Sequence, residues 1–201
     1  MKEFFLVLSS YLIGSISFAY TIGLVFKGID IRTVGDKNAG AANAFRHLGP
    51  VLGVVVAILD ICKGISVILI VKFFNVKLPV IFLCGIAVVI GHTWPVYFGF
   101  KGGRGVSCAI GIFFALFPIP TLVLMAIMAL IIYTTGSINI AITTLFVSIL
   151  IFAVLVEKSF MLFLYVLSIS LLLLIIDLIT VRKLSSEEKE ESLHVHIRIR
   201  R

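Results

Sequence analysis

Long apolar runs separated by short polar segments are the main pattern of this chain. At ~1.5 Å per residue, each run is long enough to cross the ~30 Å hydrocarbon core of a bilayer as a helix. We therefore expect an all-α fold: a polytopic integral membrane bundle of about seven transmembrane helices over residues 1–184, followed by a charged cytoplasmic tail over residues 185–201. The apolar runs lie at about residues 4–26, 49–71, 79–98, 105–133, 138–156 and 159–181.

The fourth run is interrupted by the segment FPIP at residues 117–120. Pro118 and Pro120 each lack a backbone N–H and clash with the preceding turn, so the run is either one kinked helix or two short antiparallel ones. Cations gather in the loop after the first run and again after residue 181, which places both in the cytoplasm and the N-terminus outside. This arrangement needs an odd number of spans, and it favours two short helices joined at Pro118–Pro120.

Composition excludes a soluble globular protein. Hydrophobic residues make up 61% of the chain and charged residues only 13%, against roughly 25% in an average soluble domain. The net charge of +7 suits an anionic ligand or anionic lipid headgroups, although it could also serve only to orient the helices. Cys62, Cys84 and Cys108 stand singly in apolar runs, so we expect inert thiols and neither a disulfide nor a metal site.

The first loop, residues 28–49, reads GIDIRTVGDKNAGAANAFRHLG. Asn38 and Asn43 can each donate and accept hydrogen bonds, and the small residues around them let the backbone approach a ligand closely. Arg46 precedes the second span, where a guanidinium can bind two phosphate oxygens at once. A phosphate site is one interpretation of this loop, and a plain positively charged cytoplasmic loop is the other.

The glycine loop, residues 100–107, reads FKGGRGVS. Its glycines allow successive backbone N–H groups to turn toward one anion, and the helix that begins near Gly105 favours an anion at its N-terminus. Lys101 and Arg104 add positive charge. His92 lies nine residues before Lys101, where it could act as a general base, donate a hydrogen bond or be purely structural.

Two further polar groups lie within or beside apolar runs. Asp60 and Lys63 in DICKG are three residues apart on one helix face, so they can neutralise each other, yet charges inside a span usually mark a functional site. Ser137 and Asn139 in YTTGSIN open a helix, where Ser137 could simply be an N-cap. Together with the two loops, these groups suit a ligand that carries both a phosphate and an acyl chain.

These segments resemble the bacterial acyl-phosphate:glycerol-3-phosphate acyltransferases. The resemblance covers about residues 12–139 and rests on DIRTVGDKNAGAANAFRHLG, GHTWPVYFGFKGGRGV, DICKG and, more weakly, TTGSIN. It implies seven helices in the bacterial cytoplasmic (inner) membrane, with the active site facing the cytoplasm. The implied reaction transfers a fatty acyl group from acyl phosphate to glycerol 3-phosphate, giving lysophosphatidic acid and phosphate with no cofactor, metal or nucleic acid.

The resemblance and the chemistry of the loops together predict the site. We expect direct attack on the acyl carbon, because no nucleophile with a paired base is evident. The predicted catalytic residues are His92, Lys101 and Ser137. The residues predicted to bind the substrate phosphates are Asp36, Asn38, Asn43, Arg46, Lys63, Gly102, Gly103, Arg104, Gly105 and Asn139.

The chain also departs from the usual pattern of that family. Asp36 stands where a serine is usual, and its charge beside a phosphate must be neutralised by a neighbour such as Lys37, Arg32 or Arg46. Arg104 stands where a lysine is usual. Further departures, at Asp177 and Ile179, raise the alternative of a divergent paralogue. A non-enzymatic membrane transporter or lipid-binding protein for phosphorylated ligands is the second function that these basic loops would suit.

Overall fold

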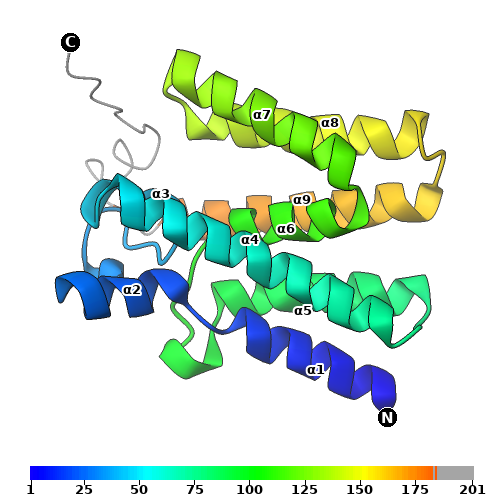
Figure 1. Ribbon diagram of the computed structural model, residues 1–201, viewed down its shortest axis with the longest axis horizontal. Coiled ribbons are helices and arrows are strands. Elements are labelled where there is room, and N and C mark those ends of the chain that lie inside the picture. The colour runs from blue at the N-terminus through cyan, green and yellow to red at the C-terminus, as the bar shows by residue number, and fades with distance from the viewer. Residues whose placement is uncertain (183, 185–201) are drawn as a thin grey trace. The chain divides into compact units, whose positions relative to one another are not determined.

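The computed structural model describes residues 1–182 and Leu184, and this part of the chain is helical with no strand. The charged tail expected over residues 185–201 lies outside the described residues. The chain forms two compact units, one from Met1 to Pro118 and a second that begins at Ile119 (Figure 1). The all-α membrane bundle expected from the apolar runs is confirmed.

The first unit contains both polar loops and the helices that hold them. Its first span is divided, because α1 ends at Gly14 and α2 begins at Phe18. The elements in chain order are α1 (Lys2–Gly14), α2 (Phe18–Lys27), the 3₁₀ turn η1 (Ile31–Thr33), α3 (Ala41–His47), α4 (Pro50–Phe73), α5 (Leu78–Thr93), the 3₁₀ turn η2 (Val96–Phe98) and α6 (Val106–Leu116).

The expected break in the fourth run occurs at its prolines. The helix α6 ends at Leu116, and α7 (Pro118–Thr135) begins with Pro118 in its first turn, where a missing N–H costs no intrahelical hydrogen bond. Within the described residues, six helical segments are long and apolar enough to cross a membrane, counting α1 and α2 as one. The short apolar α6 is additional, so about seven apolar segments are present.

Two helix pairs in the first unit approach each other closely because glycines stand at their contacts. The helices α4 and α6 pack together, as do α1 and α5, which run side by side in Figure 1. A Cβ atom added to Gly64 would overlap the carbonyl oxygen of Cys108, and one added to Gly111 would overlap that of Ile61. Small residues at such contacts let membrane helices gain packing energy from backbone proximity.

The first loop is folded on a small apolar core of its own. Ile31 and Ala44 are fully buried, and Ala39 and Leu48 are nearly so, packed with residues of α2 and α4. Asn43, also fully buried, donates from Nδ2 to the carbonyl oxygens of Ile31, Val34 and Asn38 at 3.0–3.1 Å. This core gives the polar side chains of the loop fixed positions.

The second unit is built from the remainder of α7 together with α8 (Ile138–Leu155) and α9 (Phe160–Arg182). The helices α8 and α9 pack against each other, with Ala141 and Ile149 of α8 and Val166 and Ile169 of α9 buried. In both units large apolar side chains are exposed along the helices, such as Leu69 and Leu174 at 54% each. A lipid environment accounts for these surfaces.

Candidate functional site

The first loop and the glycine loop meet through backbone and side-chain hydrogen bonds. The N–H of Ala39 donates to the carbonyl oxygen of Gly102 at 3.2 Å. Arg32 Nη1 donates to the carbonyl oxygen of Phe98 at 2.8 Å, just before the glycine loop. The two long polar motifs, far apart in the sequence, therefore form one structural site at one end of the first unit.

Asp36 lies at the centre of this site between two arginines. Its Oδ2 atom is 2.9 Å from Nη2 of Arg46 and 3.3 Å from Nη2 of Arg104, so one carboxylate oxygen contacts a guanidinium from each loop. The Asp36 side chain is 1% exposed, and those of Arg46 and Arg104 are 10% and 15% exposed. The shared carboxylate thus holds one guanidinium group from each loop side by side, and guanidinium groups bind phosphate oxygens well.

The two asparagines expected to bind substrate have different surroundings. The side-chain amide of Asn43 donates its hydrogen bonds to carbonyl groups of the loop, so this residue stabilises the loop backbone. Asn38 is 7% exposed, and its backbone N–H donates to Asp36 Oδ1 at 3.3 Å. The geometry therefore ties both residues to the placement of Asp36 and its neighbours.

The glycine loop folds back onto the end of α5. The N–H groups of Gly102 and Gly103 donate to the carbonyl oxygens of Thr93 and His92, each at 3.1 Å. These amides therefore stabilise the loop itself. Gly105 adopts a φ of 84°, a region open to glycine, and begins α6 directly after Arg104. The Lys101 side chain is exposed beside this turn.

Beneath the glycine loop lies a buried cluster of Asp60, Lys63 and His92. Lys63 Nζ lies 3.1 Å from Asp60 Oδ1 and 3.1 Å from His92 Nδ1, and His92 Nδ1 lies 3.4 Å from the same carboxylate oxygen. Lys63 also donates to the carbonyl oxygens of Gly14 and Ile16, at the break between α1 and α2. All three side chains are at most 5% exposed.

Asp30 and Arg32 form a second polar group, which the sequence interpretation did not include in the site. Arg32 donates to both carboxylate oxygens of Asp30, at 2.9 and 2.8 Å, and its guanidinium lies 4.1 Å from the centre of the Tyr20 ring. These hydrogen bonds hold the pKa of Asp30 below its usual value and raise the pKa of Arg32. The sequence feature that could have indicated this pair is the spacing Asp-x-Arg at the start of η1, where Asp30 is the N-cap.

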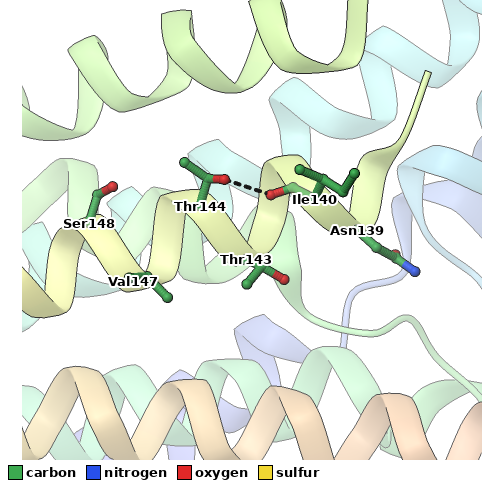
Figure 2. Close-up of a pocket in the computed structure, with 6 residues that line it drawn as sticks. All are labelled: Asn139, Ile140, Thr143, Thr144, Val147 and Ser148. Carbon is green, nitrogen blue, oxygen red and sulfur yellow. Dashed lines mark hydrogen bonds between the residues drawn. The ribbon is translucent and has the colours of Figure 1, made fainter. Parts of the chain in front are cut away.

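Ser137 and Asn139 belong to the second unit. Ser137 is the N-cap of α8, and its hydroxyl accepts a hydrogen bond from the N–H of Ile140 at 3.4 Å. Asn139 lines an open hollow along one side of α8, and the lining residues recur every four positions along the helix (Figure 2). The hollow is lined by Asn139, Ile140, Thr143, Thr144, Val147 and Ser148.

The fold and the two joined loops define a class of protein: a multi-pass helical membrane protein in which arginines from two polar loops meet at one end of its first unit. Comparison with known families is more specific. The model of the family described as glycerol-3-phosphate acyltransferase matches residues 4–185, so this chain belongs to that family. The match includes both polar loops and the buried cluster.

Individual relatives agree with this assignment. The chain is 39% identical over 141 residues to a glycerol-3-phosphate acyltransferase of Fusobacterium nucleatum, covering 70% of this chain and 73% of the relative. It is 48% identical over 119 residues to that of Aquifex aeolicus, covering 59% and 62% of the two chains.

Solved structures are similar over most of the chain. A crystal structure of PlsY (YgiH), an integral membrane glycerol 3-phosphate acyltransferase in its glycerol 3-phosphate form, is 35% identical with a TM-score of 0.82. The match covers 91% of this chain and 92% of that one. The lysophosphatidic acid form of PlsY matches at 34% identity with a TM-score of 0.80, covering 91% of each chain.

Proposed function

We propose that this chain transfers a fatty acyl group from acyl phosphate to glycerol 3-phosphate, releasing phosphate and lysophosphatidic acid. The observation that supports this most is the meeting of Arg46 and Arg104, one from each loop, on a single buried carboxylate. Both substrates carry phosphate, and guanidinium groups can each bind two phosphate oxygens at once. The family and the two ligand-bound forms of PlsY support the same acceptor and product.

The reaction needs little more than accurate placement of two anions. Acyl phosphate is a mixed anhydride with a good leaving group. The acceptor hydroxyl attacks the acyl carbon, the bond from that carbon to the phosphate oxygen breaks, and the departing phosphate takes the hydroxyl proton. Placement of the two reactants and stabilisation of charge on the leaving phosphate are then the main contributions of the protein.

We assign the residues of the first unit to these tasks. Arg46, with Asn38 and Asp36 around it, would hold one phosphate. Lys101, Arg104 and the turn at Gly105 would hold the other and stabilise its charge as it leaves. Asn43, Gly102 and Gly103 would act by holding the two loops together. Ser137 and Asn139 remain predicted substrate contacts in the second unit.

We also propose that the site faces the cytoplasm from the inner membrane. Lys27 directly precedes the first loop, which carries Arg32, Lys37 and Arg46. The glycine loop adds two more cations at the same end of the unit. Such a concentration of cations at one end of a short-looped membrane protein favours a cytoplasmic location. Glycerol 3-phosphate would then reach the site from water, and the acyl chain from the bilayer.

The direct test is turnover by the purified protein in lipid nanodiscs. Acyl phosphate should release phosphate only when glycerol 3-phosphate is present, with lysophosphatidic acid formed in equal amount by mass spectrometry. Acyl-coenzyme A as the donor, and glycerol as the acceptor, are the matched controls. Turnover with acyl-coenzyme A but not with acyl phosphate would overturn the proposed donor.

Lys101 offers a test of the site within the same assay. Its side chain is exposed, so Lys101→Ala should leave the melting temperature unchanged. Loss of a charge-assisted phosphate contact worth about 1.5–3 kcal/mol should lower kcat/KM by roughly 10- to 150-fold. Lys27→Ala, at the exposed end of α2, is the control and should keep its activity. Equal activity of the two variants would remove Lys101 from the site.

A further inference from the structure

Lys63 has more acceptors around it than an ammonium group has protons. Its Nζ makes three hydrogen bonds: to the carbonyl oxygen of Gly14 at 3.1 Å, to that of Ile16 at 2.8 Å, and with His92 Nδ1 at 3.1 Å. Asp60 Oδ1 is also 3.1 Å from Nζ and 3.4 Å from His92 Nδ1, as an ion-pair partner that is not aligned for a hydrogen bond with either group. The Lys63 side chain is 2% exposed, so water does not compete for these protons.

The proton count decides the state of the histidine ring. An ammonium group has three protons to donate and no lone pair to accept with. Two of its protons go to backbone carbonyls, which can only accept, and the third goes to His92 Nδ1. That nitrogen must therefore offer its lone pair, and in a neutral imidazole the ring proton is then on Nε2. The ring nitrogen facing away from Lys63 is a donor.

The Nε2 side of the ring faces the glycine loop. A Cβ atom added to Gly103 would overlap Nε2, and it would lie 2.9 Å from the carbonyl oxygen of Ala39 in the first loop. Nε2 makes no hydrogen bond within the part of the chain that the structure describes. The nitrogen therefore lies against the loop junction, one residue before Arg104, with its hydrogen-bonding capacity unused.

We propose that Lys63 is a positioning residue that fixes His92 in the tautomer with the proton on Nε2, so that His92 donates a hydrogen bond to a substrate phosphate oxygen. This last step rests on the proposed function, whereas the tautomer does not. An ionised phosphate oxygen can only accept, so a protonated Nε2 attracts it and a bare one would repel it. The proposal resolves the two chemical roles considered for His92 in favour of the donor.

The same assignment excludes His92 as the acceptor of the hydroxyl proton. With a proton already on Nε2 and Nδ1 occupied by Lys63, His92 has no free lone pair with which to act as a general base. The hydroxyl oxygen forms its bond to the acyl carbon, the anhydride carbon–oxygen bond breaks, and its electron pair leaves with the phosphate. The hydroxyl proton joins that phosphate, while the Nε2–H group remains intact as a donor to it.

Nitrogen NMR of the protein labelled with ¹⁵N-histidine tests the tautomer directly. The His92 signals are identified by their loss in His92→Gln. We expect an unprotonated, hydrogen-bonded Nδ1 and a protonated Nε2. A protonated Nδ1 with a bare Nε2, or protons on both, would overturn the proposal without any measurement of activity. If the tautomer is found and acyl phosphate is not a substrate, the proposed function fails alone.

A variant of Lys63 tests its positioning role. In Lys63→Met, Nδ1 loses its donor, and the two His92 signals should move toward the averaged values of a ring that exchanges between tautomers. Lys72→Met, on the last turn of the same helix, removes a lysine that donates to Ala115 and should leave the His92 signals and the activity unchanged. Unchanged signals in Lys63→Met would show that Lys63 does not set the tautomer. If Lys63→Met does not fold, the spectrum of the unmodified protein decides.

Two replacements of His92 separate a donor from a base. Gln places an amide N–H near the position of Nε2, whereas Asn reaches only to that of Nδ1. We expect His92→Gln to keep kcat within about tenfold of the unmodified enzyme, and His92→Asn to lose roughly 10- to 150-fold with little change in KM. Equal and severe loss in both, at unchanged melting temperature, would overturn the donor role, because neither amide can replace a base.

Discussion

Asp36 looks unfavourable in the proposed phosphate site, and its partners in the structure account for its presence there. A carboxylate beside a phosphate is repulsive unless cations offset it. The sequence suggested its neighbours Lys37, Arg32 and Arg46 as partners. The structure pairs Asp36 with Arg46 and with Arg104, which is 68 residues away, while Arg32 pairs with Asp30. Asp36 thus orients the two guanidinium groups that we assign to phosphate.

Replacing Asp36 should reduce stability and activity together. In Asp36→Ser the two arginines lose their shared carboxylate and repel each other in a poorly hydrated site, and breaking a buried ion pair typically costs ~3–5 kcal/mol. We expect a lower melting temperature and a fall in kcat/KM for glycerol 3-phosphate. Asp30→Ser, which removes a more exposed carboxylate from the same loop, is the control and should have the smaller effect. A tenfold or larger fall in KM in Asp36→Ser would contradict the role given to this carboxylate.

Asp30 should stabilise the folded protein at neutral pH and lose this effect in acid. Hydrogen bonds from Arg32 place its folded pKa below the ordinary value of 3.8, so the unfolded chain takes up a proton first as the pH falls. The stabilisation is complete well above 3.8 and is lost as the pH falls from there through the folded pKa. Melting temperatures of the unmodified protein and Asp30→Asn should differ at neutral pH and converge in acid. A difference that grows in acid would contradict this sign.

Residue-scale contacts were predictable only when they are local. The pair of Asp60 and Lys63 followed from their spacing of three on a helix. The third member, His92, is 29 residues from Lys63, and no periodicity in the sequence connects the two. The backbone contacts of the glycine loop are also invisible in the sequence, which suggested instead that the amides of Gly102 and Gly103 face an anion. In the structure they bind carbonyl groups at the end of α5.

At the scale of elements, the apolar runs predicted the spans and the prolines predicted the break between α6 and α7. The interruption of the first span between Gly14 and Phe18 was not predicted. That segment reads GSIS and contains no proline, and its glycine and two serines are too few to divide the long apolar run in the sequence. Two carbonyl groups at the break accept hydrogen bonds from Lys63, a tertiary partner that the local sequence does not show.

The close contact of α4 with α6 should depend on its glycines. In Gly111→Ala the added methyl group would overlap the backbone of Ile61, and relieving such overpacking typically costs ~1–3 kcal/mol. We expect a lower melting temperature in detergent and, because α6 carries the glycine loop, a reduced kcat. Ser66→Ala on the exposed face of α4 is the control and should leave both unchanged. A melting temperature equal to that of the control would show that the helices are less tightly packed than described.

At the scale of the molecule, the hydrogen bonds fix which parts of the first unit share an end. The two polar loops meet through Ala39 and Gly102 at one end. At the other, Lys2 donates to the carbonyl oxygen of Phe74 at 2.6 Å, just after α4 ends. The N-terminus therefore lies beside the turn between α4 and α5, on the opposite side of the bundle from the site. Charge parity in the sequence gave the same arrangement, since it placed the N-terminus outside and the loops in the cytoplasm.

Labelling of single cysteines in intact cells tests this orientation for the whole protein. Cys62 is first replaced by Ala, because it is exposed, whereas Cys84 and Cys108 are buried and should not react. Lys77→Cys, at the start of α5, should then react with a membrane-impermeant maleimide added outside, because its turn is at the end away from the site. Lys27→Cys, at the end of α2, should react only after the membrane is opened, since it lies beside the cation-rich loops. The protein without added cysteine supplies the background.

The reverse pattern would place the phosphate site outside the cell, where cytoplasmic glycerol 3-phosphate could not reach it. Labelling of both cysteines from outside would mean that the chain inserts in two orientations.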